Sequence, residues 1–211
     1  MIFKGVMVSD LSRKGNQVLP SFSQVLPHTS TSKHTVTETY NNGSKYVGEK
    51  ENSKRHGKGI FYYAEGGYYT GEWKDNTMHG YGKLYYPSGQ IAYAGYWFQD
   101  KFHGYGELHN EEDNLPPYSP NNKVLGFDGM LESSNNGIDY RNFEEVGEKW
   151  RKYEGNFKND CKDGYGVLEF WNGEKWAGNF RGDKAEGEGN FYGRNGEIVS
   201  GVWRGNRFYG R

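Results

Sequence analysis

One pattern of tyrosine and glycine recurs six times in this 211-residue chain, and it constrains the fold more than any other feature. Successive copies start 23 or 24 residues apart, apart from one gap of 60 residues between Tyr93 and Tyr153. A fixed period of this length is typical of repeat architectures, in which small units stack on one another. The copies are YVGEKENSKRHGKG from Tyr46, YTGEWKDNTMHGYG from Tyr69, YAGYWFQDKFHGYG from Tyr93, YEGNFKNDCKDGYG from Tyr153, WAGNFRGDKAEGEG from Trp176 and VSGVWRGNRFYG from Val199.

Each copy alternates in the way that a strand with one covered face does. In the copy from Tyr69, large apolar or glycine residues alternate with polar residues over 69–74 and again over 80–86. Turn-forming residues separate such stretches, so each repeat is expected to be a β-hairpin, and successive hairpins are expected to extend one sheet. The predicted fold is therefore all-β: an elongated single-sheet solenoid of antiparallel hairpins. The turn segments are KDNT at 74–77, PSG at 87–89, WNG at 171–173 and RNG at 194–196.

Composition predicts what fills the core. Glycine occupies 32 positions, and the chain has 12 Phe, 6 Trp and 18 Tyr. Glycine weakens an ordinary strand, so here it is expected to leave room for a neighbouring ring to lie flat on the backbone. One hairpin cannot bury such a ring alone, and stability should come from neighbouring repeats.

These copies resemble the MORN (membrane occupation and recognition nexus) repeat, whose pattern is close to YxGxW…HGxGxxxYxxG. The resemblance covers about 36–108 and 127–211. It implies a stack of β-hairpins without a catalytic site. Small proteins built almost wholly of these repeats include radial-spoke-head and other axonemal proteins. The sequence departs from the pattern at Lys50 and Val199, and at Asp163, Glu186 and Tyr209, which replace the usual His.

Four segments follow from these patterns. Residues 1–35 are an extended or disordered N-terminal arm, either a flexible tail or an arm that orders on a partner through anchors such as Phe3, Phe22 and Leu26. Residues 36–108 form the first repeat block, and 109–126 form an acidic, proline-rich surface loop. Residues 127–211 form the second block, including a degenerate repeat over 127–152. The last copy has no polar cap, so its edge is expected to meet another chain or to be protected by strong twist.

No chemical motif accompanies the repeats. The sequence contains no GxxxxGK[ST], HExxH or CxxC, and no catalytic, cofactor or metal site is expected. His56, His79 and His103 should lie about 10 Å apart, two strand spacings, which is too far to share one zinc; they are expected to tie adjacent turns together. Cys161 is the single cysteine and lacks a paired histidine in its repeat. Basic and acidic residues nearly balance, 26 against 27, which argues against nucleic acid as a partner.

The leading functional hypothesis is a non-catalytic scaffold that binds other protein subunits rather than a small-molecule substrate. The resemblance implies a ciliary or flagellar axoneme, hence a cytoplasmic, cytoskeletal location. One alternative is a membrane-proximal adaptor for phospholipids, using the basic stretches at 54–58 and 204–211; another is a regulator that positions a separate enzyme chain. Large aromatic residues of the repeats are candidates for partner contact, although they could equally form the core. They are Trp73, Trp97, Phe157, Phe180 and Trp203.

Overall fold

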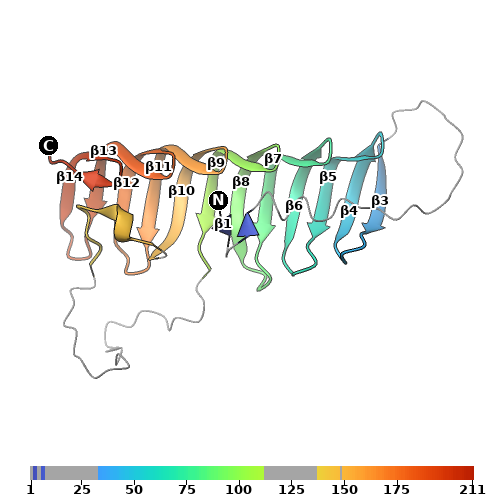
Figure 1. Ribbon diagram of the computed structural model, residues 1–211, viewed down its shortest axis with the longest axis horizontal. Helices are drawn as coiled ribbons and strands as arrows, with labels where there is room; N and C mark the ends of the chain where they lie inside the picture. Colours follow the sequence, from blue (N-terminus) through green and yellow to red (C-terminus); the bar gives the residue numbers. More distant parts are fainter. Residues whose placement is uncertain (1, 4–5, 8–32, 112–136, 148) are drawn as a thin grey trace, which may run out of the picture. The chain divides into compact units, whose positions relative to one another are not determined.

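The computed structural model describes residues 2–3, 6–7, 33–111, 137–147 and 149–211. Strands β3 to β15 follow the chain in hydrogen-bonded order within one 13-stranded sheet, and β1 pairs with β2 separately (Figure 1). The all-β prediction of successive antiparallel hairpins is confirmed. The elements are β1 (Ile2–Phe3), β2 (Val6–Met7), β3 (His34–Thr39), β4 (Lys45–Glu51), β5 (Lys54–Tyr62), β6 (Tyr68–Lys74), β7 (Thr77–Tyr85), β8 (Ile91–Phe98), β9 (Lys101–His109), the 3₁₀ turn η1 (Phe143–Glu145), β10 (Trp150–Lys158), β11 (Cys161–Phe170), β12 (Lys175–Arg181), β13 (Lys184–Tyr192), β14 (Ile198–Arg204) and β15 (Arg207–Phe208).

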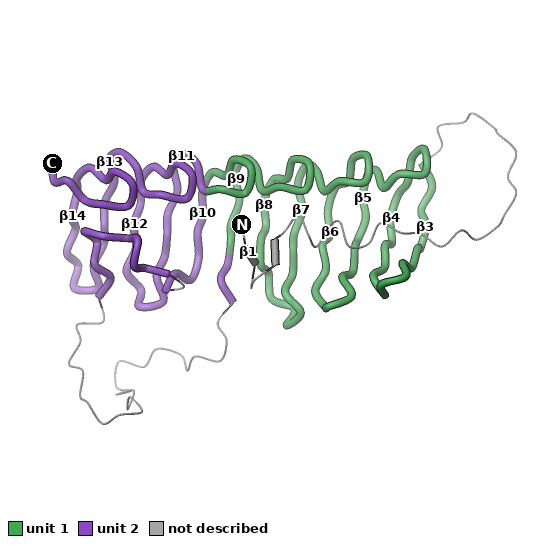
Figure 2. The backbone as a smooth tube through the Cα atoms, in the orientation of Figure 1, with its two compact units in different colours: residues 1–108, 156–161 green, residues 109–155, 162–211 purple. Residues whose placement is uncertain are grey.

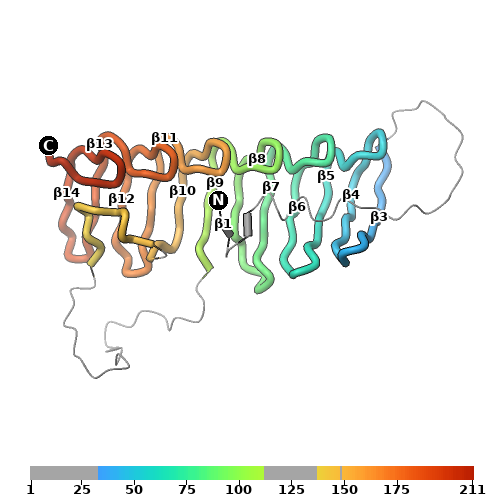
Figure 3. The backbone as a smooth tube through the Cα atoms, in the orientation of Figure 1, coloured from blue at the N-terminus to red at the C-terminus, as the bar shows by residue number. Residues whose placement is uncertain are grey.

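The chain forms two compact units, shown in different colours in Figure 2. Unit 1 comprises residues 1–108 and 156–161, and unit 2 comprises 109–155 and 162–211. Within each unit, strands adjacent in sequence lie side by side, as the colour gradient of Figure 3 shows. Each unit is therefore built almost wholly from contacts between neighbouring repeats.

A row of glycines crosses the strands of unit 1. Gly59 lies opposite Gly71, which in turn lies opposite Gly82. A Cβ atom built on Gly71 would lie 2.5 Å from both the Gly82 Cα and the Tyr69 hydroxyl, so only glycine fits beneath this ring. The row also includes Gly48, Gly95 and Gly106.

Rings on this glycine row form the predicted aromatic core. Tyr69 packs edge-to-face between two tryptophans, with ring centroids 5.2 Å from both Trp73 and Trp97. The polar atoms of the rings find partners: the Tyr69 hydroxyl donates to the Glu72 carbonyl at 2.9 Å, and Trp73 Nε1 donates to the Gly59 carbonyl at 3.1 Å. This repeat thus buries its large rings with their polar atoms paired, whereas the indole N–H of the buried Trp176 in unit 2 has no hydrogen-bond partner among the described residues.

Turn residues clip consecutive repeats together. Asp75 and Asn76 both have positive φ, which is the backbone of a two-residue type I′ hairpin turn. The Asn76 side chain accepts the Arg55 backbone N–H at 2.9 Å, and the Asn76 N–H donates back to the Arg55 carbonyl at 3.0 Å. We call such a reciprocal pair a staple. In the described part of the chain, staples join Arg55 with Asn76, Met78 with Asp100, Phe102 with Asp160, Lys162 with Asp183 and Ala185 with Asn206.

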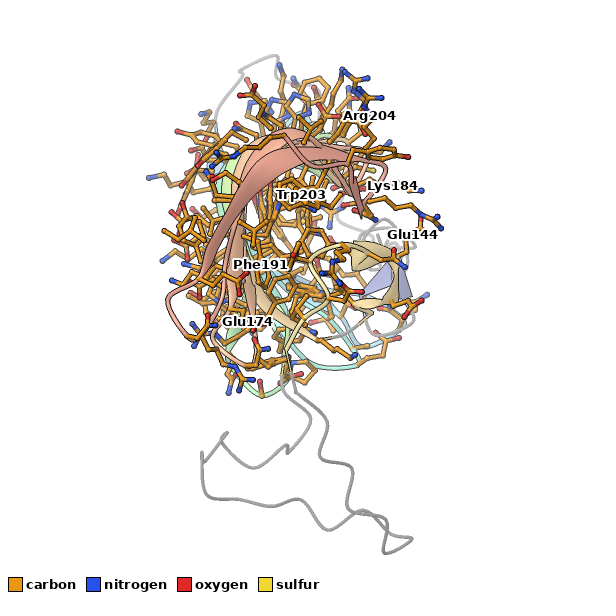
Figure 4. The ribbon with its side chains drawn as sticks, turned by 90° about the vertical axis from the view of Figure 1, so that its left-hand side faces the viewer. Glu144, Glu174, Lys184, Phe191, Trp203 and Arg204 are labelled. Atoms are coloured by element: carbon orange, nitrogen blue, oxygen red, sulfur yellow. The ribbon has the colours of Figure 1, made fainter. Side chains whose placement is uncertain are left out.

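In unit 2 the sheet is covered by residues 137–147, which we call the strap. Its Phe143 ring lies parallel to Trp203, with centroids 6.2 Å apart, and meets Trp176 edge-on at 6.0 Å. Figure 4 shows Trp203 and Phe191 inside the curved sheet, with Glu144 on the turn that faces them. Phe143 is only 8% exposed, so the strap completes the core of unit 2.

The strap also protects the last edge of unit 2. Phe143 N–H donates to the Asn206 carbonyl at 2.9 Å, and Phe208 N–H donates to the Arg141 carbonyl at 3.0 Å. A segment of the same chain therefore covers the edge that the sequence assigned to another chain or to strong twist. The prediction of a degenerate repeat at 127–152 fails over 137–147, because this part forms the strap instead of a hairpin; residues 127–136 and 148 lie outside the described residues.

The predicted segment boundaries hold in part. The sheet begins at His34, two residues before the predicted start of the first block at 36. Strand β9 ends at His109, so the first residue of the predicted 109–126 loop is still in the sheet; residues 112–126 lie outside the described residues. In the predicted arm, only β1, β2 and residues 33–35 are described.

Candidate interaction surface

The five rings predicted to contact partners all lie in the core. Their exposed fractions are between 0 and 6%, because each ring packs on the glycine row or on a neighbouring ring. The structure therefore supports the core alternative for them, and a partner would have to open the sheet to reach them. They are Trp73, Trp97, Phe157, Phe180 and Trp203. Of the predicted arm anchors, Phe3 lies in β1, whereas Phe22 and Leu26 lie outside the described residues.

The basic stretch at 54–58 does not present a cluster of available cations. Arg55 is 3% exposed, and its guanidinium lies 4.5 Å from the Trp73 ring centroid. Lys54 Nζ lies 3.3 Å from the Asp75 carboxylate. At the other predicted stretch, 204–211, Arg207 lies 3.8 Å from Glu144. Ion pairing and burial thus reduce the positive charge that either stretch offers to an anionic membrane.

The opposite face of unit 1 exposes a different set of aromatic side chains, which we call the outer tyrosine face. These residues alternate with the core residues along β5 to β9 and therefore point away from the glycine row. Many are about half exposed: Tyr81 46%, Tyr96 54%, Phe98 44% and Tyr105 52%. The full set is Tyr62, Tyr68, Tyr81, Tyr85, Tyr96, Phe98 and Tyr105.

Three of these tyrosines form a continuous row across three strands. Tyr62 lies opposite Tyr68, and Tyr68 lies opposite Tyr85. Their ring centroids are 5.7 and 4.3 Å apart, and the second pair is stacked. Desolvation and the neighbouring Tyr85 raise the pKa of Tyr68 above its ordinary value.

A shallow depression lies beside this row. It has a volume of about 590 Å³, and the backbones of Gly59, Gly71 and Gly82 contribute to its lining. Its lining combines apolar surface with charges of both signs, which suits a polypeptide better than a uniformly charged ligand. The lining side chains are Lys58, Ile60, Thr70, Glu72, Tyr81, Lys83 and Tyr85.

The same repeat positions carry ion pairs in unit 2. Glu169 lies opposite Lys175, as Tyr62 lies opposite Tyr68. Glu169 accepts hydrogen bonds from Lys175 at 2.8 Å and Arg151 at 2.6 Å. Burial alone would raise the pKa of Glu169, but these two cations outweigh it and hold the pKa at about 2. The fold therefore does not itself require tyrosine at positions 62 and 68, whereas the position of Tyr85 also carries a tyrosine, Tyr192, in unit 2.

The predicted histidines do not form a shared site. His56 lies 3.5 Å from Glu51, and the rings of His79 and His103 flank Phe98 at 5.2 and 5.7 Å. Within the described ranges no group of three or more His, Cys, Asp or Glu side chains is arranged to hold a metal ion. Cys161, which forms no disulfide, has intermediate exposure and lies at the start of β11. No helix in the described part of the chain is long and apolar enough to cross a membrane.

Sequence reasoning missed both the outer tyrosine face and the staples. The signal for the staples was present, because the eighth residue of the last five copies is always Asp or Asn, whereas the first copy has Ser53. The signal for the outer face was a set of tyrosines at positions that alternation assigns to polar residues.

Comparison with known proteins identifies the family of these repeats. No curated protein matches the chain. A solved structure of the "SAS-4 (dCPAP) TCP domain in complex with a Proline Rich Motif of Ana2 (dSTIL)" of Drosophila melanogaster is 13% identical, with 88% of this chain and 99% of that chain covered and a TM-score of 0.33. That TM-score is too low for the match to inform on function or partners. The model of the MORN repeat matches residues 46–68, 69–91, 93–110, 153–175 and 176–198, more than half of the chain. The chain therefore belongs to the MORN repeat family.

Proposed function

We propose that this protein is a non-catalytic scaffold that binds protein partners through the outer tyrosine face of unit 1. The observation that carries the proposal is the tyrosine row, in which the fold does not require the tyrosines at 62 and 68. Tyrosine combines a large apolar ring with a hydroxyl that can hydrogen-bond, and it is enriched where proteins meet. The mixed charges around the depression favour a polypeptide partner.

The assembly that we propose is a ciliary or flagellar axoneme, with a cytoskeletal location. Support for this comes from the resemblance to small axonemal proteins that consist almost wholly of MORN repeats. A membrane-proximal adaptor is the alternative, and the burial of Arg55 together with the Lys54–Asp75 pair leaves it with less support.

Unit 2 supplies a test that keeps the fold. The triple variant Tyr62→Glu, Tyr68→Lys, Tyr96→Asn replaces three tyrosines of the outer tyrosine face by the residue types that unit 2 has at the same repeat positions. Those unit 2 residues are Glu169, Lys175 and Asn179. We expect the variant to fold, because unit 2 holds these side chains in the same register. The matched control is Tyr165→Glu, which changes an exposed tyrosine of unit 2.

The measurement is affinity capture of the tagged chain from its own ciliated cells at near-native expression, followed by mass spectrometry. We expect wild type and the Tyr165→Glu control to recover axonemal components, and the triple variant to lose most of them. Equal recovery by the triple variant would refute the role of the outer tyrosine face. Recovery of membrane proteins, with flotation of the purified chain on anionic liposomes, would favour the adaptor, and recovery of a single enzyme would favour the regulator.

A further inference from the structure

The first strand of the sheet, β3, has one hydrogen-bonding edge that pairs with β4 and one that no described segment covers. Tyr40 N–H donates to the Ser44 carbonyl at 2.8 Å, just beyond the paired strands. Hydrogen-bonded pairs recur at every second residue of an antiparallel ladder. His34, Val36 and Glu38 therefore direct their N–H and C=O groups toward β4.

The alternate residues direct their backbone groups the other way. Thr35, Thr37 and Thr39 present N–H and C=O groups along the outer edge, and all three side chains are exposed. Threonine is a strong strand former. Sheet edges in native proteins are usually blunted by lysine or proline within the strand, by a bulge, or by a covering segment. The sequence of β3, HTVTET, has neither residue, and its pairing with β4 has no register shift.

We propose that β3 pairs antiparallel with β3 of a second copy of this chain, so that the sheet continues across a two-fold axis. The register follows from the side chains. When Val36 lies opposite its own copy, His34 of each chain lies opposite Glu38 of the other, and Thr35 lies opposite Thr37. An imidazole N–H can donate to a carboxylate across a strand pair, and β-branched side chains directly opposite each other stabilise a sheet, so the strand is complementary to itself in this register.

The other end of the described sheet, in unit 2, is partly covered by the chain itself. The strap bonds to residues 206–208 and covers the edge of β15 in unit 2. A pairing through β3 is isologous and closed, because both chains use the same strand and the β15 edge of each chain stays covered by its own strap. We therefore expect a dimer and no further growth.

The strand geometry supplies a variant that should block pairing while the chain stays folded. Thr37→Pro removes an outward N–H that makes no bond to β4, and proline is tolerated at such a position. Val36→Pro is the opposite control, because it removes an N–H that bonds to β4 and should loosen β3 itself. His34→Glu places two carboxylates opposite each other in the dimer, yet within the chain the new carboxylate faces Lys50.

Sedimentation equilibrium of the full chain between about 1 and 300 µM measures the dimer. We expect a monomer–dimer equilibrium, which Thr37→Pro weakens at least about tenfold, since it removes two of the central strand-to-strand hydrogen bonds. His34→Glu should also weaken it, whereas His34→Lys, which places a cation opposite Glu38, should not. Circular dichroism of each variant checks that the sheet is retained.

Three outcomes would overturn the proposal. The first is a full chain that stays monomeric at 300 µM. The second is a dimer that Thr37→Pro leaves intact, which would place the contact elsewhere. The third is a full chain that is monomeric and dimerises only after deletion of residues 1–32, which would show that the chain's own N-terminal segment covers this edge.

Discussion

Arg55 shows how one repeat position can hold chemically different side chains. The equivalent residue is Met78 in the next repeat and Phe102 in the third, and both are fully buried. The Arg55 guanidinium lies 4.5 Å from the Trp73 centroid and 5.1 Å from that of Phe61, and its Nη2 donates to the Asn76 carbonyl at 2.9 Å. Favourable ring contacts thus offset the cost of burying the cation.

This arrangement predicts opposite results for two substitutions. Arg55→Met introduces the side chain that the next repeat has at this position. It should leave the free energy of unfolding within about 1 kcal/mol of wild type, because a hydrophobic residue of similar volume can replace a buried charge at little cost. Arg55→Ala leaves a cavity and should destabilise by about 2–4 kcal/mol. Denaturant unfolding of both variants measures the difference, and an equal loss in the two would show that the charge, not the volume, matters.

For individual residues, the sequence predicted the core better than the surface. Period-two alternation assigned Tyr69 and Trp73 to a covered face, and both are buried. Alternation cannot tell whether a covered face packs inside the chain or against a partner, and so the core rings were also candidates for partner contact. It also could not show that Arg55 points inward, because its environment is formed by rings from neighbouring repeats.

Among the elements of structure, the two-residue turns do more than reverse the chain. In the five copies from Tyr69 onward, the second residue of the turn supplies an acceptor to the strand that follows the turn of the previous repeat. The turns thus form a second line of connection beside the strand ladder. This role depends on the neighbouring repeat, which is why turn chemistry alone predicted the hairpins but not the staples.

Asp100 offers the sharpest test of a staple. Its side chain accepts the Met78 N–H at 2.7 Å, and its φ is +65°. Asp100→Asn should keep the staple, since Asn76 and Asn206 make the same bond elsewhere. Asp100→Gly keeps the backbone of the turn and removes the acceptor, so it should cost about 1–2 kcal/mol in thermal or denaturant unfolding. Equal stability of the two variants would count against the staple.

The strap is the element that sequence patterns could not predict. Its fold depends on Phe143 and on the rings of β12 and β14 that receive it, residues more than 30 positions away. FDGML at 127–131 matches the opening of a repeat, and this local likeness led to the prediction of a degenerate hairpin over 127–152. Tertiary packing, not local pattern, decides the structure of residues 137–147.

For the molecule as a whole, the ion pairs of Glu169 in unit 2 should make the free energy of unfolding fall as the pH is lowered into the acid range. The pKa of Glu169 is about 2 in the folded chain, below the ordinary 4.5. A lowered pKa stabilises the fold above pH 4.5, and this contribution is lost as the pH falls from about 4.5 to 2. Because Arg151 and Lys175 are half exposed, solvent screening limits it to about 1 kcal/mol.

The test compares unfolding of wild type and Glu169→Gln between pH 2 and 7. The stability difference should be constant above about pH 5 and should vanish toward pH 2. Arg151→Met, which leaves Lys175 in place, should reduce this pH dependence without abolishing it. A difference that persists unchanged at pH 2 would mean that Glu169 acts through packing and not through its charge.

One staple has a consequence for how the chain could be assembled. Phe102 and Asp160 exchange their two hydrogen bonds across 58 residues, in the same geometry as neighbours 21 or 22 residues apart, and Phe157 packs on Tyr93 and Phe102 beside them. The covalent link between these two copies is thus not what aligns them. Two polypeptides divided within 112–136 should find each other and re-form the sheet, so the chain is a natural candidate for a split reporter.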